Sequence, residues 1–427
     1  MKKRSHLFRG LTALFAFLLL LCMSLTTLTL GNTTWINSNL NIEDTKVIGG
    51  AQDDEFVVYW PNDYGYNNTA LIEVYYDAAD VNVQIAAEGV TLLKNEEGAL
   101  PLAEGTRLTL FGNASVNSQI YRTSSPDYIP YVDYVSAMQT QFGAENVNTV
   151  LCENIYAGLG TTGTSSVAEA KITAVQAYEN TWQSDYNDAA VVVIARSGSE
   201  GNDIYQYAAA DTYPDGSPRR MMDLSTNEEA LMAYLAAQKQ AGVFDKIIVV
   251  LSTEFEQELG FLREYDVDAA ILTGMTGSYG CTAVARVLAG AVNPSGRLPD
   301  TYAYDNLSSP AMQNFGDFRF VNADGSLTGY SYVNYAEGVY VGYKYYETRY
   351  EDRVMGQGSA GDYDYASTVL YPFGYGLSYT TFEQKIDSVN VDLAAKTATA
   401  TVTVTNTGDV PGKDAVQLYV SVPYTDY

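Results

Sequence analysis

One stretch of the chain reads Ala189-Ala-Val-Val-Val-Ile-Ala-Arg196-Ser-Gly-Ser-Glu200-Gly-Asn-Asp203, and it decides the fold. Its first seven residues are apolar, which predicts a strand buried on both faces. A polar loop with two glycines follows at once and presents the carboxylate of Glu200. Parallel sheets bind their ligands in loops of this kind, beyond the carboxyl ends of the strands. We therefore expect an α/β fold with Glu200 at a binding edge.

Strand and helix patterns alternate on both sides of this stretch. Ser225-Thr-Asn-Glu228 is a capping box that opens one helix, and Gly290 ends another. We expect the other strands at 107–111, 246–251 and 269–272, and the other helices at 81–93, 131–141 and 167–178. This alternation predicts a mostly parallel sheet covered by helices on both faces, an α/β sandwich domain over residues 83–305.

The apolar period changes to two near the C-terminal end. Residues 306–382 form a loop-rich extension, in which glycine and tyrosine are frequent. Apolar side chains then alternate at 398–404 and again at 416–422, which is typical of antiparallel strands. A β-sandwich domain needs about 100 residues, whereas the segment 383–427 is far shorter. We interpret it as the truncated beginning of such a domain.

The N-terminal segment 1–31 predicts either a signal peptide or a membrane anchor. Lys2, Lys3, Arg4 and Arg9 precede an uncharged apolar run from Leu11 to Leu30. The positive-inside rule then places the rest of the chain outside the cytoplasm, secreted or at the cell surface. Residues 32–82 are polar and rich in tyrosine, and we expect a surface extension there.

Composition excludes several classes of function. Without the four basic residues of the leader, 20 basic and 51 acidic residues remain, a formal charge of −31. So acidic a chain is a poor partner for nucleic acid or anionic lipid and suits a neutral substrate. The one histidine, His6, lies in the leader, which excludes Ser-His-Asp catalysis and the commonest zinc sites. Cys152 and Cys281 could pair or stay free.

Calcium binding is weakly indicated at one place only. Asp362 and Asp364 have the spacing that opens a calcium loop, but the third ligand, the glycine and the closing glutamate of that motif are absent. The chain also has no Walker phosphate loop and no dinucleotide fingerprint after a first strand. We expect no metal and no organic cofactor.

Five groups of motifs, in order, resemble the glycoside hydrolase family 3 enzymes over roughly residues 84–427. The order matters more than any single motif. They are Ala86-Ala-Glu-Gly-Val-Thr-Leu-Leu-Lys94-Asn95 with Ala99-Leu-Pro-Leu102, Asn293-Pro-Ser-Gly-Arg-Leu-Pro299, Val339-Tyr-Val-Gly-Tyr-Lys-Tyr-Tyr-Glu-Thr348, Tyr371-Pro-Phe-Gly-Tyr-Gly-Leu-Ser-Tyr379, and Asn406-Thr-Gly-Asp409 with Gly412-Lys-Asp-Ala-Val-Gln-Leu-Tyr419. The last two groups are similar to the approach to that family's fibronectin III-like domain and to its first strands.

The resemblance implies an exo-acting, retaining glycosidase of the β-glucosidase type. In this family a (β/α)8 barrel provides a nucleophilic aspartate, and a loop of the α/β domain provides the acid/base glutamate. Glu200 occupies the matching position of that loop. Ser124 stands where the family often has a serine that contacts the sugar. Arg196 and Asp203 are candidate substrate-binding residues; Arg196 could instead pair with a carboxylate or be exposed, and Asp203 could instead stabilise a turn.

The chain departs from the commonest family plan because we find neither the barrel nor its nucleophile motif. Some members have a permuted order, with the barrel last, so we expect the barrel downstream or in trans. The substrate would be an oligosaccharide or β-glucoside, and this fragment alone would be inactive. The alternative is a non-catalytic carbohydrate-binding or scaffolding protein of the same fold.

Overall fold

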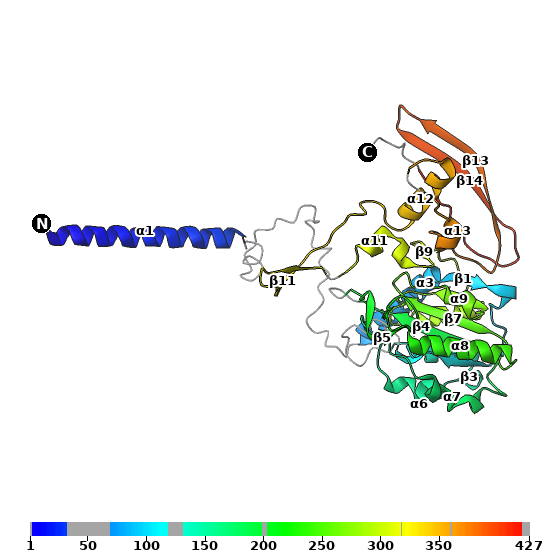
Figure 1. The fold of residues 1–427 in the computed structure, drawn as a ribbon. Coiled ribbons are helices and arrows are strands. Elements are labelled where there is room, and N and C mark those ends of the chain that lie inside the picture. Colours follow the sequence, from blue (N-terminus) through cyan, green and yellow to red (C-terminus); the bar gives the residue numbers. More distant parts are fainter. Residues whose placement is uncertain are drawn as a thin grey trace. The chain divides into compact units, whose positions relative to one another are not determined.

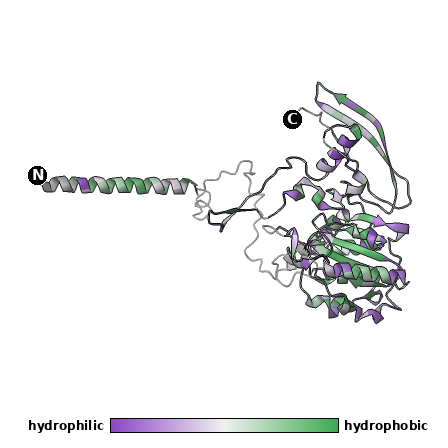
Figure 2. Ribbon diagram, in the orientation of Figure 1, coloured by the Kyte–Doolittle hydropathy of each residue, from purple (hydrophilic) through white to green (hydrophobic). Residues whose placement is uncertain are grey.

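The computed structural model describes residues 2–31, 69–117, 131–198, 203–316, 318–358 and 361–420. The chain divides into two units, Met1–Asn67 and Asn68–Tyr427. In the first unit, helix α1 (Lys2–Gly31) contains a stretch, Phe8–Thr27, that is long and apolar enough to cross a membrane (Figures 1 and 2). Such an N-terminal helix suits either a signal sequence or an anchor, as the sequence predicted.

A six-stranded mixed sheet is the centre of the second unit (Figure 1). The edge strand β1 is antiparallel to β8, and the other neighbours are parallel. In spatial order the strands are β1 (Thr91–Asn95), β8 (Ala269–Leu272), β7 (Ile247–Thr253), β4 (Ala189–Arg196), β2 (Leu108–Phe111) and β3 (Val147–Asn148).

Helices flank this sheet. Helix α10 (Cys281–Leu288) contacts α3 (Thr69–Gly89) and α5 (Tyr134–Phe142), whereas α8 (Thr226–Gln240) contacts β7 and α7 (Ile172–Gln176). All eight residues of β4 are buried, as the apolar run from Ala189 predicted. Short helices complete the layers: α4 (Ala114–Asn117), α6 (Val150–Asn154) and α9 (Phe261–Glu264).

The predicted capping box is present at the start of α8. The Ser225 hydroxyl accepts from the Glu228 backbone N–H at 3.3 Å, and the Glu228 carboxylate accepts from the Ser225 N–H at 2.8 Å. Two backbone N–H groups at the start of α8, those of Ser225 and Glu228, thus each donate to the side chain of the other residue.

The predicted helix at 81–93 is wrong at its C-terminal end, and part of the expected extension, 69–82, is helical. Residues 69–89 form α3, whereas Thr91 to Asn95 form β1, paired with β8 from Thr91 opposite Leu272. Residues 91–93 are fully buried. The helix ends at Gly89, and the buried residues beyond it form the edge strand of the sheet.

The extension after the sheet contains more regular structure than we expected. Helix α12 (Tyr343–Met355) lies in the segment expected to be a loop, and Gly356 in the left-handed conformation (φ 66°) ends it. The other elements there are α11 (Pro310–Gln313), α13 (Tyr365–Thr368), and the hairpin β10 (Arg319–Val321) and β11 (Leu327–Ser331). Strand β12 (Val369–Tyr371) pairs with β9 (Tyr302–Ala303), which lies just before the extension.

The beginning of the fibronectin III-like part is the hairpin β13 (Phe382–Asp392) and β14 (Thr397–Asn406). The strand expected at 416–422 is absent from 416–420, and 421–422 lie outside the described residues. Among the described residues, β13 and β14 pair only with each other. Arg297, in the segment that follows the α/β sheet, contacts residues on both sides of the hairpin. Its guanidinium lies 2.7 Å from the Asp414 carboxylate and 2.8 Å from the Gly376 carbonyl.

The two cysteines of the α/β domain are free and buried. Burial raises the pKa of the Cys152 thiol to about 11 and that of Cys281 to about 12. Both therefore remain protonated thiols at neutral pH, which makes them unreactive core residues.

Candidate active site

The carboxyl ends of β4 and β7 lie side by side at the edge of the sheet where we expect the site. Arg196, the last residue of β4, is the register partner of Thr253, the last residue of β7. The loop that bears Glu200 begins two residues beyond Arg196. Glu200 itself, and the candidate sugar contact Ser124, lie outside the described residues, so both remain predictions.

Arg196 is only 1% exposed and forms a bidentate ion pair with Glu228. Its Nη1 and Nη2 lie 2.9 and 2.8 Å from the two carboxylate oxygens. The other three N–H groups donate to the carbonyls of Met221, Ala195 and Asp223. All five donors of the guanidinium are thus used inside the protein. A direct bond to a sugar would require one of these to break.

Glu228 combines two tasks in one carboxylate. It closes the capping box of α8 and also neutralises the charge of Arg196, while remaining only 4% exposed. The carboxyl end of β4 is therefore bonded both to the start of α8 and to the backbone at 221–223. A buried, bidentate pair of this kind is rigid, because loss of either partner leaves an unpaired charge in the interior.

Ser197, the next residue, is also hydrogen-bonded to another segment of the chain. Its buried hydroxyl donates to the Thr162 carbonyl at 3.2 Å. Both residues that precede Gly198 are thus held by hydrogen bonds to other segments. The first residues of the loop, Arg196 and Ser197, which we call the loop entrance, are therefore held in position.

Asp203, on the other side of the loop, is exposed and lines a pocket. This apolar pocket has a volume of about 210 Å³. Its walls come from the residues after β4 and β7 and from the extension: Asp203, Ile204, Tyr205, Gln206, Arg220, Met222, Phe255, Glu256, Glu258, Asn306, Leu307, Met312 and Phe315. Its position beyond the carboxyl ends of two parallel strands is typical of ligand sites.

Two carboxyl groups in the apolar pocket titrate near neutrality. Burial raises the pKa of Glu258 to about 7, although Arg220 lies 2.7 Å away and opposes the shift. Burial, and then the negative charge of Asp300, raise the pKa of Glu256 to about 7. Groups with such pKa values can exchange protons at physiological pH.

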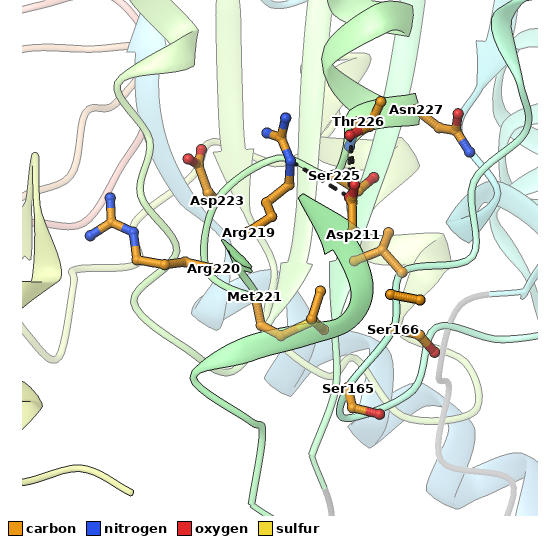
Figure 3. A pocket seen from close by; sticks show the side chains of 13 residues that line it. Ser165, Ser166, Asp211, Arg219, Arg220, Met221, Asp223, Ser225, Thr226 and Asn227 are labelled. Carbon is orange, nitrogen blue, oxygen red and sulfur yellow. Dashed lines mark hydrogen bonds and ion pairs between the residues drawn. The ribbon is translucent and has the colours of Figure 1, made fainter. Parts of the chain in front are cut away.

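A second, polar pocket of about 290 Å³ lies between strand β6 (Pro218–Arg220), its hairpin partner β5 (Tyr207–Thr212) and the start of α8 (Figure 3). Its charged groups are already paired. Asp211 accepts from the Thr226 N–H and hydroxyl at 2.9 and 2.6 Å, and Arg219 lies 2.8 Å from Glu229. Arg220 lines both pockets and separates them.

No metal site is formed by the described part of the chain, where no three His, Cys, Asp or Glu side chains gather suitably. Asp362 and Asp364, the pair with calcium-loop spacing, are both exposed.

Sequence reasoning did not identify Arg220, Glu256 and Glu258 as pocket residues. Glu256 and Glu258 directly follow the strand at 247–253, and a search for carboxylates after each strand would have found them. The hydrogen-bond partners of these residues cannot be found from the sequence. Glu258, for example, accepts from the backbone N–H of Asn306, 48 positions away.

Residues 90–343 match the family model described as the glycosyl hydrolase family 3 C-terminal domain, over more than half of the chain. The chain belongs to glycosyl hydrolase family 3. Beta-glucosidase A of Butyrivibrio fibrisolvens is 28% identical in an alignment of 417 positions that covers 86% of this chain and 44% of that enzyme. A beta-glucosidase of Ruminococcus albus is 32% identical over 237 residues, 56% of this chain and 20% of that enzyme.

Two solved beta-glucosidase structures share the fold of most of this family 3 chain. Beta-glucosidase 3B from Thermotoga neapolitana, solved with glucose, superposes with a TM-score of 0.56 at 28% identity, over 78% of this chain and 42% of that one. A beta-glucosidase from Paenibacillus barengoltzii gives 0.55 at 25% identity, over 79% of this chain and 33% of that one. The chain thus spans less than half the length of these relatives.

Proposed function

We propose that this chain contributes the general acid/base, Glu200, to a retaining β-glucosidase that removes terminal β-linked sugars. The nucleophilic aspartate would come from a (β/α)8 barrel, downstream or in trans. Membership of family 3 supports the reaction class, and the anchored loop entrance supports the residue. The observation that carries the proposal is the Arg196–Glu228 pair, which holds the end of β4 where Glu200 must project.

The chemistry needs two carboxyl groups with different protonation. In the first step Glu200 donates a proton to the glycosidic oxygen while the nucleophile attacks the anomeric carbon. In the second step Glu200, now a carboxylate, takes a proton from water, which hydrolyses the glycosyl-enzyme intermediate. The bonds of Arg196 and Ser197 at the start of the loop favour this role, since a general acid must lie within about 2.6–3.2 Å of the oxygen that it protonates.

The other candidate residues have separate roles in this proposal. Arg196 positions the loop through its bonds to the protein. Asp203 lines the apolar pocket, where its carboxylate can accept a hydrogen bond from a hydroxyl group of the substrate. Ser124 would contact the sugar. We assign 83–305 to the α/β domain, 306–382 to the extension and 383–427 to the truncated fibronectin III-like domain.

Helix α1 would place the enzyme outside the cytoplasm, either as an anchor or as a removed signal. Its basic residues all precede the uncharged run that begins at Leu11, which is the orientation of a segment whose C-terminal side is exported. A β-glucosidase at the surface or in the medium would meet oligosaccharides before they enter the cell.

The test of this role uses two substrates in an active enzyme that contains this chain. Glu200→Gln should lower kcat/KM on the order of 10²–10⁴-fold for a β-glucoside with a poor leaving group. The loss should be much smaller for 2,4-dinitrophenyl β-glucoside, whose leaving group needs no proton. Equal losses with both substrates would remove the acid role from Glu200.

A further inference from the structure

We propose that Glu169 is a positioning residue for the loop that bears Glu200. It belongs to the segment 162–169, which is hydrogen-bonded to the chain on both sides of that loop, and it connects this segment to the sheet and to α8. The inference rests on the proposed role of Glu200 and adds a residue on which the placement of that general acid depends.

The segment 162–169 contacts the chain both before and after the loop that follows β4. Before the loop, the Ser197 hydroxyl donates to the Thr162 carbonyl at 3.2 Å. After it, the Tyr205 N–H donates to the Thr164 carbonyl at 2.9 Å. Both ends of the loop are therefore bonded to one segment, and a shift of this segment moves both of them.

Glu169 connects the same segment to two other elements. Its carboxyl oxygens accept from the backbone N–H groups of Asn113 and Ala170, both at 2.8 Å. Its backbone carbonyl accepts from the side-chain amide of Asn227 at 2.9 Å. Asn113 follows β2 by two residues, and Asn227 lies in the first turn of α8. Glu169 thus joins the end of β2 to the helix start that also holds the end of β4.

The contribution of Glu169 comes from hydrogen bonds and not from an ion pair. The partners that the described chain provides for its carboxyl group are backbone N–H groups. Burial raises its pKa to about 8, the negative charge of Glu228 adds to the shift, and the two N–H groups oppose it. Tyr156, which also faces it, stays a neutral phenol because burial raises its pKa. At neutral pH Glu169 is therefore a neutral carboxylic acid, which glutamine can replace in part.

The placement of a general acid is sensitive to small displacements. The acid must lie within about 2.6–3.2 Å of the oxygen that it protonates, and a misplacement of about 1 Å can cost on the order of 10²-fold in rate. Ser197 precedes Glu200 by three residues and Tyr205 follows it by five. A movement of the segment to which both are bonded therefore reaches Glu200 through a short piece of backbone.

Amide hydrogen exchange of the full chain, followed by mass spectrometry, tests the connection without turnover. Glu169→Ala removes both acceptors of the carboxyl group, so we expect exchange in the peptides that contain Asn113 and Tyr205 to become faster on the order of tenfold. Glu169→Gln should act in the same direction by a smaller factor. Glu179→Gln is the matched control, because Glu179 is also half-buried and bonds Tyr234 in the middle of α8 at 3.2 Å. It should leave both peptides unchanged.

Kinetics in an active enzyme that contains this chain separate positioning from a loss of folded protein. Glu169→Ala should lower kcat/KM on the order of tenfold or more for methyl β-glucoside, whose leaving group needs a proton, and much less for 2,4-dinitrophenyl β-glucoside. A smaller fraction of folded enzyme would instead lower both values equally. If Glu169→Ala does not fold, Glu169→Gln serves in both measurements.

Unaltered exchange in both peptides, or equal kinetic losses with the two substrates, would overturn the positioning role of Glu169. A failure of the proposed function has a different signature, because Glu200→Gln would then itself show equal losses with the two substrates. In that case the exchange of the Glu169 variants still decides whether this residue holds the loop.

Discussion

The Arg196 guanidinium and the Glu228 carboxylate lie 2.8–2.9 Å apart through two parallel hydrogen bonds, both fully inside the protein. This pair joins the carboxyl end of the central strand β4 to the start of α8. Arg196 lies four residues before Glu200 in the chain. The geometry of the loop entrance therefore depends on an interaction inside the protein.

Removal of one partner of this pair should be strongly destabilising. Glu228→Ala leaves the Arg196 charge buried and unpaired, so we expect the free energy of unfolding in urea to fall by about 3–5 kcal/mol. Glu104→Ala, at an exposed glutamate, is the control and should stay within about 0.5 kcal/mol. The double variant Arg196→Met with Glu228→Leu should recover much of the loss. A single-variant loss below about 1 kcal/mol would contradict this account of the pair.

Stability should fall as the pH rises from about 4.5 to about 8. Burial raises the pKa of Glu256 and Glu258 to about 7 and that of Glu169 to about 8, from an ordinary value near 4.5. In this window the folded chain binds more protons than the unfolded chain, so deprotonation costs stability. Asp300 and Tyr302 face Glu256, whereas Arg220, Asp223 and Asp305 face Glu258.

Thermal unfolding at a series of pH values checks this dependence. Glu256→Gln cannot deprotonate and should flatten the slope above pH 5. Its exposed neighbour provides the control, Glu254→Gln, which should leave the slope unchanged. A slope that is identical in the parent and in Glu256→Gln would refute a neutral, buried Glu256.

Thiol labelling should separate the three cysteines. In the native chain Cys22 is exposed, whereas Cys152 and Cys281 are buried. We expect one thiol to react rapidly with a thiol reagent before unfolding and all three to react in denaturant without a reductant. Only one reactive thiol in denaturant would show a Cys152–Cys281 disulfide and would contradict the structure.

The chain alone should not hydrolyse an aryl β-glucoside. One carboxyl group cannot complete a double displacement, because no covalent intermediate forms without the nucleophile. The assay compares purified chain with its Glu200→Gln variant, so that a contaminating glycosidase is recognised by equal rates in both. Turnover that requires Glu200 would show that this chain holds a complete active site.

The sequence predicted the central elements well because their signals are local. The apolar run at 189–195 and the capping box at 225–228 each depend on neighbours within a few residues, and both are present as predicted. The end of α3 was missed because Leu92 and Leu93 continue an apolar helical period. Their burial beside β8 is a tertiary effect that overrides the period.

The site could be predicted only in part, for the same reason. Glu200 was selected by its place after a buried strand and by family resemblance. The pairing of Arg196 with Glu228 spans 32 residues, and the apolar pocket joins residues 203–206 to 306–315. Contacts over such separations have no periodic signature. The helix α12 was missed because its many tyrosines and charges show no clear apolar face.

Azide rescue of Glu200→Gln in an active enzyme that contains this chain tests the central claim most directly. Without its base, the variant should accumulate the glycosyl-enzyme from 2,4-dinitrophenyl β-glucoside, and azide should attack it without needing deprotonation. We predict a faster turnover in azide and β-glucosyl azide as the product, because two inversions retain the configuration. A variant that azide does not accelerate, or that retains parental activity in water, would contradict the assignment of Glu200 as the acid/base.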